Sequence, residues 1–260
     1  MINEHIDGGR SFDWGRASAD YARYRDIYPQ EFYDRVKALG ICDKGARVLD
    51  IGTGTGVLPR ALFGTGARFT GVDISAEQIS QARELAAQCG MDINFVCSPA
   101  EELPFSENSF DAAMACQCFW YFDHEKLSRK LHTLLKVGGR FAVLMMDWLP
   151  FEDEVAAATE RLVLKYNPQW SGGGEVRHMI DVPECWLRLF GKESEELFDL
   201  DVPFTRDSWN GRIKACRGIG ASLSWELTEQ FSREHKAMLE SMVPESFTVK
   251  HYAAITVLKA

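Results

Sequence analysis

The chain of 260 residues is predicted to adopt an α/β fold, a doubly wound and mostly parallel sheet with helices on both faces. Two observations predict this fold. Short apolar runs alternate with helical patterns between residues 46 and 146. The first of these runs leads into a glycine-rich turn, as it does where open parallel sheets bind nucleotides.

The elements of the first half follow from spacing and capping residues. Apolar residues at helical spacing predict a helix over 29–39, and Ser75 predicts the N-cap of a second helix that Gly90 ends. Asp123 predicts the cap of a third helix, which runs through Leu135. Apolar runs predict strands over 46–51, 68–73, 92–97, 110–116 and 140–146, the last after a turn at 138–139, and a helix is expected from the glycine turn to about residue 63.

The second half of the chain has a different pattern, which begins after Asp147. A loop rich in glycine and polar residues is predicted at 167–180. Helices are expected over 153–166, 183–190, 206–217 and 225–242, and strands over 197–204 and 247–258, the last with period two.

Composition and charge argue against several classes of protein. The chain has 29 basic and 38 acidic side chains, and its net charge of -9 opposes non-specific binding to nucleic acid. It has neither an apolar stretch long enough to span a membrane nor a signal-peptide pattern, so we expect a soluble cytoplasmic protein. The seven cysteines are scattered and odd in number, which indicates reduced thiols rather than disulfides or a metal site.

The glycine-rich turn lies in the segment Ala-Arg-Val-Leu-Asp-Ile-Gly-Thr-Gly-Thr-Gly at 46–56. Glycine permits a sharp turn and a close approach of the backbone to a ligand. Asp73 closes the next strand, where a carboxylate can accept hydrogen bonds from both hydroxyls of a ribose. The pair predicts an adenosine-type ligand. A tight turn in a protein without a cofactor is the alternative.

The spacing of the glycines separates two nucleotide-binding families. A dinucleotide fingerprint needs its third glycine at position 57, where this chain has Val57. The pattern Asp50-x-Gly52-x-Gly54-x-Gly56 instead resembles the first motif of class I S-adenosylmethionine-dependent methyltransferases. A proline in the first turn of the following helix is compatible with that motif, because its missing N–H costs little there.

Residues 99–105, Pro-Ala-Glu-Glu-Leu-Pro-Phe, resemble the segment that holds the adenine edge in the same superfamily. The resemblance implies that a backbone N–H of Ala100 or Glu101 meets a ring nitrogen. It also implies that a Glu101 oxygen accepts from the exocyclic amine. Pro99 replaces the usual acidic residue, so the group that reads the amine stays open. An ordinary loop that packs Phe105 is the alternative.

The segment 116–121, which follows the fourth predicted strand, matches the family position beside the methionine end of the cofactor and the substrate. The resemblance implies that Gln117 contacts the cofactor. It also implies that the neighbouring aromatic residues wall the methyl-transfer site, since aromatic faces attract a sulfonium. Burial of these aromatic side chains in the core is the alternative. The residues expected at the substrate are Phe119, Trp120, Tyr121 and Trp148.

Residues 13–29 resemble the amino-terminal lid of small-molecule methyltransferases related to trans-aconitate methyltransferase. The resemblance implies that Tyr21 covers the sulfonium. It implies as well that the guanidinium of Arg25 grips the cofactor carboxylate. A surface helix with solvated Arg and Tyr side chains is the alternative.

The resemblance is strongest over 46–147, weaker over 10–29 and 197–258, and implies a Rossmann-like sheet of seven strands with an antiparallel last strand. It does not extend over 150–195; from the change of pattern after Asp147 we infer that 148–195 forms a helical cap insertion over the carboxyl edge of the sheet. The expected organisation is an N-terminal helical lid (1–40), a cofactor-binding core (41–147), the cap insertion (148–195) and a C-terminal completion of the sheet (196–260). The cofactor-binding residues are expected to be Tyr21, Arg25, Asp50, Gly52, Thr53, Gly54, Gly56, Asp73, Ile74, Gln78, Ala100, Glu101 and Gln117.

The predicted activity is in-line transfer of the methyl group of S-adenosylmethionine to a small-molecule carboxylate, hydroxyl, amine or thiol. Alignment and exclusion of water can supply much of the rate. A base is needed only for a protonated acceptor, and Tyr121, His124 and Asp147 are candidates for it. Two other functions stay open: a non-catalytic cofactor-binding or regulatory protein, and an NAD(P)-dependent oxidoreductase. We expect no nucleic-acid, membrane or metal partner, and the sequence predicts no oligomeric state.

Overall fold

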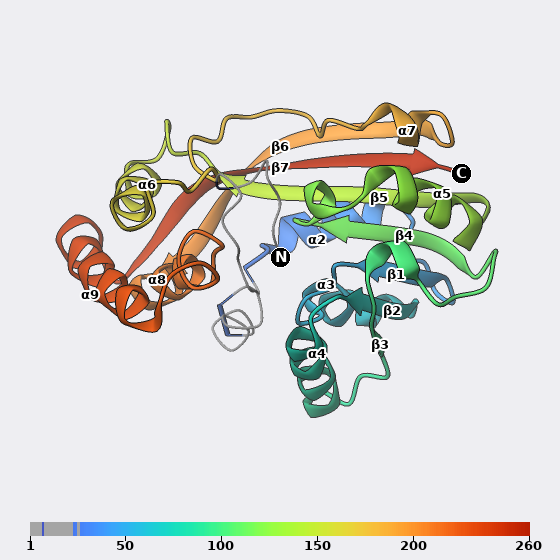
Figure 1. Ribbon diagram of the computed structural model, residues 1–260, viewed down its shortest axis with the longest axis horizontal. Coiled ribbons are helices and arrows are strands. Elements are labelled where there is room, and N and C mark those ends of the chain that lie inside the picture. Colours follow the sequence, from blue (N-terminus) through green and yellow to red (C-terminus); the bar gives the residue numbers. More distant parts are fainter. Residues whose placement is uncertain (1–6, 8–22, 25–26) are drawn as a thin grey trace. The chain divides into compact units, whose positions relative to one another are not determined.

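The computed structural model describes residues 7, 23, 24 and 27–260. They contain a seven-stranded sheet with the order β3-β2-β1-β4-β5-β7-β6, which Figure 1 shows. The central strands β1 and β4 are almost entirely buried, as strands covered on both faces must be. The strands are β1 (Arg47–Ile51), β2 (Arg68–Asp73), β3 (Asn94–Cys97), β4 (Phe110–Cys116), β5 (Leu135–Trp148), β6 (Gly191–Thr205) and β7 (Ser246–Lys259).

Strands β1 to β5 are parallel, and β7 runs against them. β1 pairs in parallel with β2 and β4, β2 with β3, and β4 with β5. Backbone hydrogen bonds join Gly139 to Ala260 and Leu149 to Lys250, so residue numbers fall along β7 as they rise along β5. The predicted sheet of seven mostly parallel strands with an antiparallel last strand is confirmed.

The helices begin where the capping residues indicate. The Ser75 hydroxyl accepts the N–H of Gln78 at 3.3 Å, and the Asp123 carboxylate accepts that of Lys126 at 3.1 Å. These bonds satisfy N–H groups that have no partner inside the helix. The helices are α2 (Gln30–Ala38), α3 (Val57–Ala61), α4 (Ala76–Gln88), α5 (His124–Leu134), α6 (Glu154–Tyr166), α7 (Glu184–Leu187), α8 (Arg206–Lys214) and α9 (Trp225–Met242).

The fifth strand starts earlier than the sequence predicts. Leu135 already pairs with Phe110, and the next pair of the ladder is Arg140 with Ala112. The intervening residues form a bulge in which Gly138 has a φ of 74°. The predicted turn at 138–139 is therefore wrong, because the glycines bend a strand that has already begun.

Several other element boundaries also differ from the prediction; α7 ends at Leu187 instead of 190, and α8 ends at Lys214 instead of 217. β6 begins at 191 instead of 197, and the added residues are mostly charged. β6 lies at the edge of the sheet, where charged side chains are tolerated because no strand pairs on the outer side. The helix after the glycine turn ends at Ala61, and a separate 3-10 turn follows over Phe63–Thr65.

The described chain divides into two compact units. We call residues 30–146, 178–198 and 253–260 the core unit, and residues 147–177, 199–252 and the described residues before 30 the helical unit. The strands β5, β6 and β7 each pass from one unit into the other. Residues 148–195 fall partly in each unit, and their role as a cap stays a prediction.

In the core unit, α4 packs on the strand that follows it. Ile79, Ala82 and Ala86 are buried and form one cluster with Phe95 of β3. Their spacing of three and four residues puts them on one side of the helix. This packing fixes the first turn of α4, which begins directly after β2.

In the helical unit, a buried polar network joins three helices. The His235 ring bonds the Thr159 hydroxyl through Nε2 at 3.1 Å and the Asn210 oxygen through Nδ1 at 3.1 Å. Trp209 donates to Thr159, and Asn210 donates to Ser232. An amide oxygen only accepts, so Nδ1 of His235 carries the proton and Nε2 accepts from Thr159. Every polar group of the network has a partner, which a buried network requires.

The network makes the stability of the protein depend on pH. Burial lowers the pKa of His235 to about 3, so the folded state holds the ring neutral. The contribution of the neutral ring to the free energy of unfolding is complete above the pKa of histidine in the unfolded chain, about 6.5. It is lost as pH falls toward 3. We expect His235→Gln to reduce the slope of unfolding free energy against pH by about 1.4 kcal/mol per pH unit between about pH 6 and 4.

Urea titrations across this pH range measure the slope. His132→Gln, at an exposed position of α5, is the control and should leave it unchanged. A slope that is the same in His235→Gln and in the unaltered protein would contradict the assignment.

Candidate functional site

The carboxyl edge of the core unit's parallel strands holds a turn with an unusual backbone. Gly52, Gly54 and Gly56 have φ values of 69°, 55° and 74°. Residues with a Cβ rarely adopt this left-handed region, so glycine at each position follows from the backbone. The turn carries the chain from the end of β1 into α3 within a few residues.

The carboxylate of Asp73 binds this turn to the end of β2. The N–H of Gly54 donates to Oδ2 and the N–H of Ser75 to Oδ1, each at 2.9 Å. Burial raises the pKa of Asp73, while the backbone N–H groups act in the opposite direction. An ionised carboxylate can accept about four hydrogen bonds, so acceptor capacity remains for two hydroxyls of a ligand.

Asp50, near the end of β1, supports the turn through a hydrogen bond. Its carboxylate is buried and accepts the hydroxyl of Thr53 at 2.5 Å. Burial raises the pKa of Asp50 to about 7. Asp50 and Thr53 therefore hold the turn in shape through a bond within the motif.

Two glycines of the turn leave room for the protein's own side chains. A Cβ on Gly52 would lie 2.6 Å from the sulfur of Cys118, and one on Gly56 would lie 2.7 Å from Cζ of Phe95. Such distances are too short for carbon contacts. At these two positions the packing of the protein fills the space that we expected a ligand to use.

Ile74 and Gln78 follow Asp73 in the chain, between the end of β2 and the first turn of α4. Ile74 is 57 % exposed, although it is apolar. Gln78 is buried, and its Oε1 atom has no hydrogen-bond partner in the described part of the chain. A buried acceptor without a donor, close to an exposed apolar side chain, fits a site that a polar and partly apolar ligand completes.

Glu101 has a structural contact that the sequence does not reveal. Ala100 and Glu101 lie in a 3-10 turn over Ala100–Glu102. Oε1 of Glu101 accepts the N–H of Asp123 at 2.8 Å, just before α5. One oxygen of Glu101 thus supports the start of a helix, and its contact with an adenine amine stays a prediction.

Gln117 has a strained backbone at the end of β4. Its φ is 60°, a conformation that residues other than glycine rarely adopt outside functional sites. Its N–H donates to the Leu144 carbonyl at 3.0 Å, and its side-chain amide N–H donates to the Met146 carbonyl. These bonds fix the side chain and leave Oε1 as its remaining acceptor.

The aromatic residues after Gln117 have different environments. Phe119 is buried and packs against Phe141 and Trp186, which makes it part of the core. Trp120 is 40 % exposed, and its ring lies 6.0 Å from that of Tyr121. Of the aromatic residues expected at the substrate on this segment, Trp120 is therefore the one with a large exposed surface.

His124 has its imidazole lone pair in use. The indole N–H of Trp186 donates to Nδ1 of His124 at 3.1 Å, so the neutral ring carries its proton on Nε2. Burial lowers the pKa of His124. In this arrangement neither nitrogen offers a free lone pair to a substrate, and the ring holds α7 against α5.

Two predicted site residues, Tyr21 and Arg25, lie outside the described residues. Asp147 and Trp148 belong to the helical unit, where Asp147 accepts the N–H of Trp148 at 2.9 Å. The Trp148 side chain is buried and donates to Oε1 of Glu160 at 2.7 Å.

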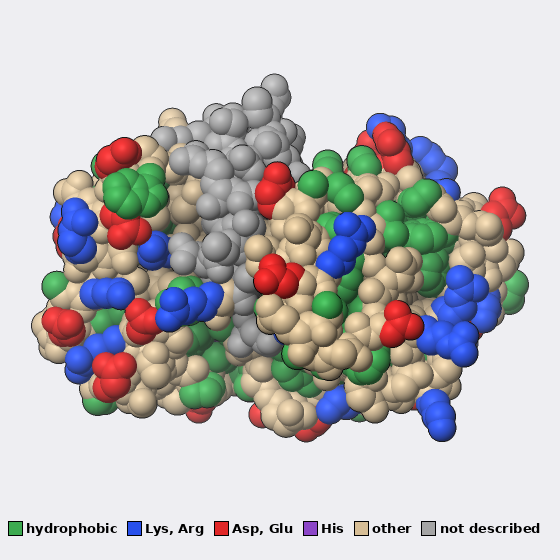
Figure 2. Space-filling view, turned by 90° about the horizontal axis from the view of Figure 1, so that it is seen from below, with side chains coloured by type: hydrophobic (Ala, Val, Ile, Leu, Met, Phe, Trp, Pro, Cys, Tyr) green, Lys and Arg blue, Asp and Glu red, His purple; other side chains and the backbone are tan. Residues whose placement is uncertain are grey.

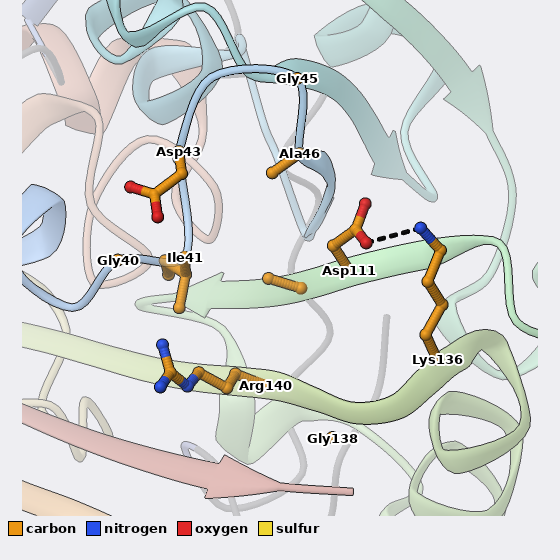
Figure 3. A pocket seen from close by; sticks show the side chains of 10 residues that line it. Gly40, Ile41, Asp43, Gly45, Ala46, Asp111, Lys136, Gly138 and Arg140 are labelled. Atoms are coloured by element: carbon orange, nitrogen blue, oxygen red, sulfur yellow. Dashed lines mark hydrogen bonds and ion pairs between the residues drawn. The ribbon is translucent and has the colours of Figure 1, made fainter.

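A cavity of about 450 Å³ lies at the opposite, amino edge of the core unit's sheet (Figure 3). Its lining includes Ala46, just before β1, and Asp111 at the start of β4. Lys136 pairs with Asp111 at 2.5 Å, and Arg140 pairs with Glu193 at 2.8 Å. Of its charged lining groups, Asp111 and Lys136 partner each other, and the cavity lies at the other edge of the sheet from the glycine turn.

Charged side chains of both signs lie on the surface, and the described residues contain neither a group of metal ligands nor a membrane-spanning helix. Basic and acidic side chains are interspersed on the face that Figure 2 shows. Within residues 7, 23, 24 and 27–260, no three His, Cys, Asp or Glu side chains are grouped as metal ligands. No helix in this same part of the chain is both long and apolar enough to cross a membrane.

Cys118 packs against the glycine turn, a contact that the sequence did not indicate. Its sulfur lies against Gly52 and donates to the Ile51 carbonyl at 3.1 Å. Burial raises the pKa of its thiol well above the ordinary value, so the group is a packing element rather than a nucleophile. The feature of the sequence that could have indicated this contact is the small side chain directly after Gln117.

Sequence comparison relates the central part of the chain to methyltransferases. Residues 49–143 match the family described as "Methyltransferase domain". The ubiquinone biosynthesis O-methyltransferase of Xanthomonas axonopodis is 27% identical over 59% of this chain and 65% of that protein. The demethylmenaquinone methyltransferase of Thermus thermophilus is 37% identical over 38% of this chain and 46% of that protein. The chain thus spans less than two thirds of the length of these curated relatives.

Solved structures share the fold over nearly the whole chain. The crystal structure of the cyclase SpnF superposes with a TM-score of 0.57, 18% sequence identity, and coverage of 96% of this chain and 97% of that chain. At this identity the similarity concerns the fold. Together with the sheet order, it confirms a Rossmann-like α/β architecture.

Alanine at Gly56 should destabilise the protein more than alanine at Gly45. Both glycines have positive φ, 74° and 85°, which costs a residue with a Cβ about 1–2 kcal/mol. A Cβ at Gly45 has no neighbour within 4 Å, whereas one at Gly56 overlaps Phe95 and should cost about 1–3 kcal/mol more. Urea titration of both variants measures the difference. Equal losses would show that Phe95 yields to the new methyl group.

Proposed function

We propose that this chain, which belongs to the class I S-adenosylmethionine-dependent methyltransferases, transfers the methyl group of that cofactor to a small-molecule acceptor. The observation that carries the proposal is the bond between Gly54 and the Asp73 carboxylate at the carboxyl edge of the sheet. It joins the glycine turn and the acid of the next strand, the two groups that would grip a nucleoside.

The residues of this edge fit the cofactor in both shape and polarity. We assign the ribose hydroxyls to Asp73, which keeps acceptor capacity. The adenine ring of the cofactor would contact Ile74 and Gln78 on one side and the 3-10 turn at Ala100–Glu102 on the other. Gln117 would present Oε1 to the methionine end, where an ammonium group needs an acceptor. Tyr21 and Arg25 stay predicted contacts of the methionine moiety.

Methyl transfer requires alignment more than acid or base chemistry. When bound, the cofactor supplies an electrophilic methyl group on a sulfonium, and the protein must place the acceptor in line with it and exclude water. Gln117 contributes a side chain that is fixed by its bond to Met146. His124 contributes no free lone pair, because Nδ1 accepts from Trp186. Of the three predicted bases, His124 is therefore the least suited to accept a proton.

The names of two relatives and the net charge of the chain support a small-molecule methyl acceptor. The names of two relatives refer to ubiquinone biosynthesis and to demethylmenaquinone, both of which concern small molecules. We extend the small-molecule acceptor to this chain, and with it a cytoplasmic location, as part of the proposal. The net charge of -9 supports an acceptor other than nucleic acid.

Two alternatives have distinct tests. An NAD(P)-dependent oxidoreductase would enhance NADH fluorescence on binding, and Val57, in place of the third glycine of a dinucleotide fingerprint, opposes it. A non-catalytic cofactor-binding protein would bind S-adenosylhomocysteine with normal affinity but methylate no member of a broad metabolite panel. The fold does not decide between this alternative and the methyltransferase, because one fold can support different functions.

Calorimetric titration with S-adenosylhomocysteine tests the proposed cofactor. We expect a dissociation constant on the order of 10 μM for the unaltered protein. Asp73→Asn should weaken binding at least about tenfold, because an amide turns an N–H₂ group toward N–H donors that need an acceptor. Asp111→Asn, which changes a carboxylate at the amino edge, is the matched control and should leave the affinity unchanged.

Two results would reject the cofactor assignment. One is an unaltered protein that does not bind S-adenosylhomocysteine at millimolar concentration. The other is an Asp73→Asn variant that retains its fold, judged by circular dichroism, and binds as tightly as the unaltered protein.

A further inference from the structure

Asp50, in the strand that leads into the glycine turn of the core unit, carries a carboxyl group that is buried without a cation. The side chain is 3 % exposed, and the Thr53 hydroxyl donates to its Oδ2 at 2.5 Å. Within the described residues, none of the groups that act on this carboxyl is a Lys or Arg. A buried carboxylate with so little compensation is costly to ionise.

The strand beside Asp50 fixes the position of the Thr53 hydroxyl. Gly71 of β2 lies opposite Asp50 in the parallel ladder. A Cβ on Gly71 would lie 2.7 Å from the Thr53 hydroxyl oxygen, so the missing side chain makes room for this group. A hydroxyl can donate to a carboxylate or accept from a carboxylic acid. The contact is therefore compatible with both protonation states of Asp50.

The second carboxyl group at this edge, that of Asp73, has stronger support for its charge. The backbone N–H groups of Gly54 and Ser75 donate to its two oxygens. Burial raises the pKa of Asp73, and these N–H groups oppose the shift. Hydrogen bonds to the charged form favour ionisation, so Asp73 is the member of the pair that keeps its charge.

Asp50 is the member of the pair that holds a proton near neutral pH. Burial, and to a smaller extent the charge of Asp73, raise the pKa of Asp50 to about 7 against the bond from Thr53. Two thiols also lie within reach of its charge. Burial and the charge of Asp50 raise the pKa of Cys42 to about 12 and that of Cys118 well above its ordinary value. Both thiols therefore stay neutral while Asp50 titrates.

We propose that Asp50 makes the cofactor site selective for a sulfonium over a thioether, an inference that rests on the methyltransferase function proposed above. S-adenosylmethionine carries a positive sulfonium, whereas the sulfur of S-adenosylhomocysteine is an uncharged thioether. The ionised carboxyl group of Asp50 favours the charged methyl donor. When Asp50 is protonated in the free protein, binding of the donor releases this proton to the solvent.

This effect acts through the electric field and needs no contact between Asp50 and the ligand. Charges interact more strongly in a buried environment than in water, because the effective dielectric constant is lower. Asp50 lies in β1, which is next to β4 in the sheet, and the segment predicted to meet the methionine end follows β4. The selectivity would favour the methyl donor over the product that transfer leaves behind.

Calorimetric titration with S-adenosylmethionine and S-adenosylhomocysteine between about pH 5.5 and 8 tests the proposal. As pH rises, the dissociation constant of the product divided by that of the donor should increase about threefold to tenfold in the unaltered protein. Asp50→Asn, a neutral isostere that can still accept from Thr53, should remove this increase. Asp111→Asn, at the amino edge, is the matched control and should retain it.

Two further measurements keep the proposal testable if Asp50→Asn does not fold. Thr53→Val removes a hydrogen bond that favours the charged carboxyl, so the increase should move to higher pH. Titration of the unaltered protein near pH 6.5, in two buffers with different ionisation enthalpies, counts the released protons. The donor should release more protons than the product does.

The outcomes separate this inference from the proposed function. A ratio of dissociation constants that is independent of pH overturns the role of Asp50, as does an Asp50→Asn variant that retains the increase. Equal proton release by the two ligands overturns it as well. In each of these cases both ligands still bind, and the cofactor assignment stands. An unaltered protein that binds neither ligand rejects the methyltransferase function itself.

Discussion

The hydrogen bonds from Gly54 and Ser75 to the two oxygens of Asp73 hold together the edge on which the rest of the structure depends. Because β1 and β2 are parallel, their carboxyl ends lie at the same edge of the sheet, and one carboxylate can bind the turn that follows each strand. Burial alone would favour the protonated acid, and the backbone N–H groups oppose this shift. The backbone N–H groups that position the carboxylate therefore also favour its charged form.

Close packing around the turn explains the glycines better than ligand contact does. Cys118 and Phe95 occupy the positions that side chains on Gly52 and Gly56 would need. Gly54 instead supplies an N–H to Asp73. Gly52 and Gly56 thus permit close packing in the interior, and Gly54 donates a hydrogen bond at the edge of the sheet. All three share a left-handed backbone.

The proposed cofactor would be held largely by main-chain geometry in the core unit, where strand ends and turns place N–H groups and acceptors. The glycine turn and the Asp73 carboxylate both belong to this unit. The fold itself does not specify the acceptor, because one fold can support different activities.

The sequence by itself determined the features that depend on neighbours along the chain. Apolar spacing and capping residues gave the strands of the parallel sheet, the caps at Ser75 and Asp123, and the full extent of α9. The motif at 50–56 and Asp73 likewise indicated the edge where a nucleoside would bind. Tertiary structure decided the contacts between distant residues, such as Glu101 with Asp123, and Trp186 with His124. It also decided that Phe119 is buried and that β5 begins before its glycines. The physical reason is that a side chain's partners are set by which elements pack against it, and a local pattern contains no information about that choice.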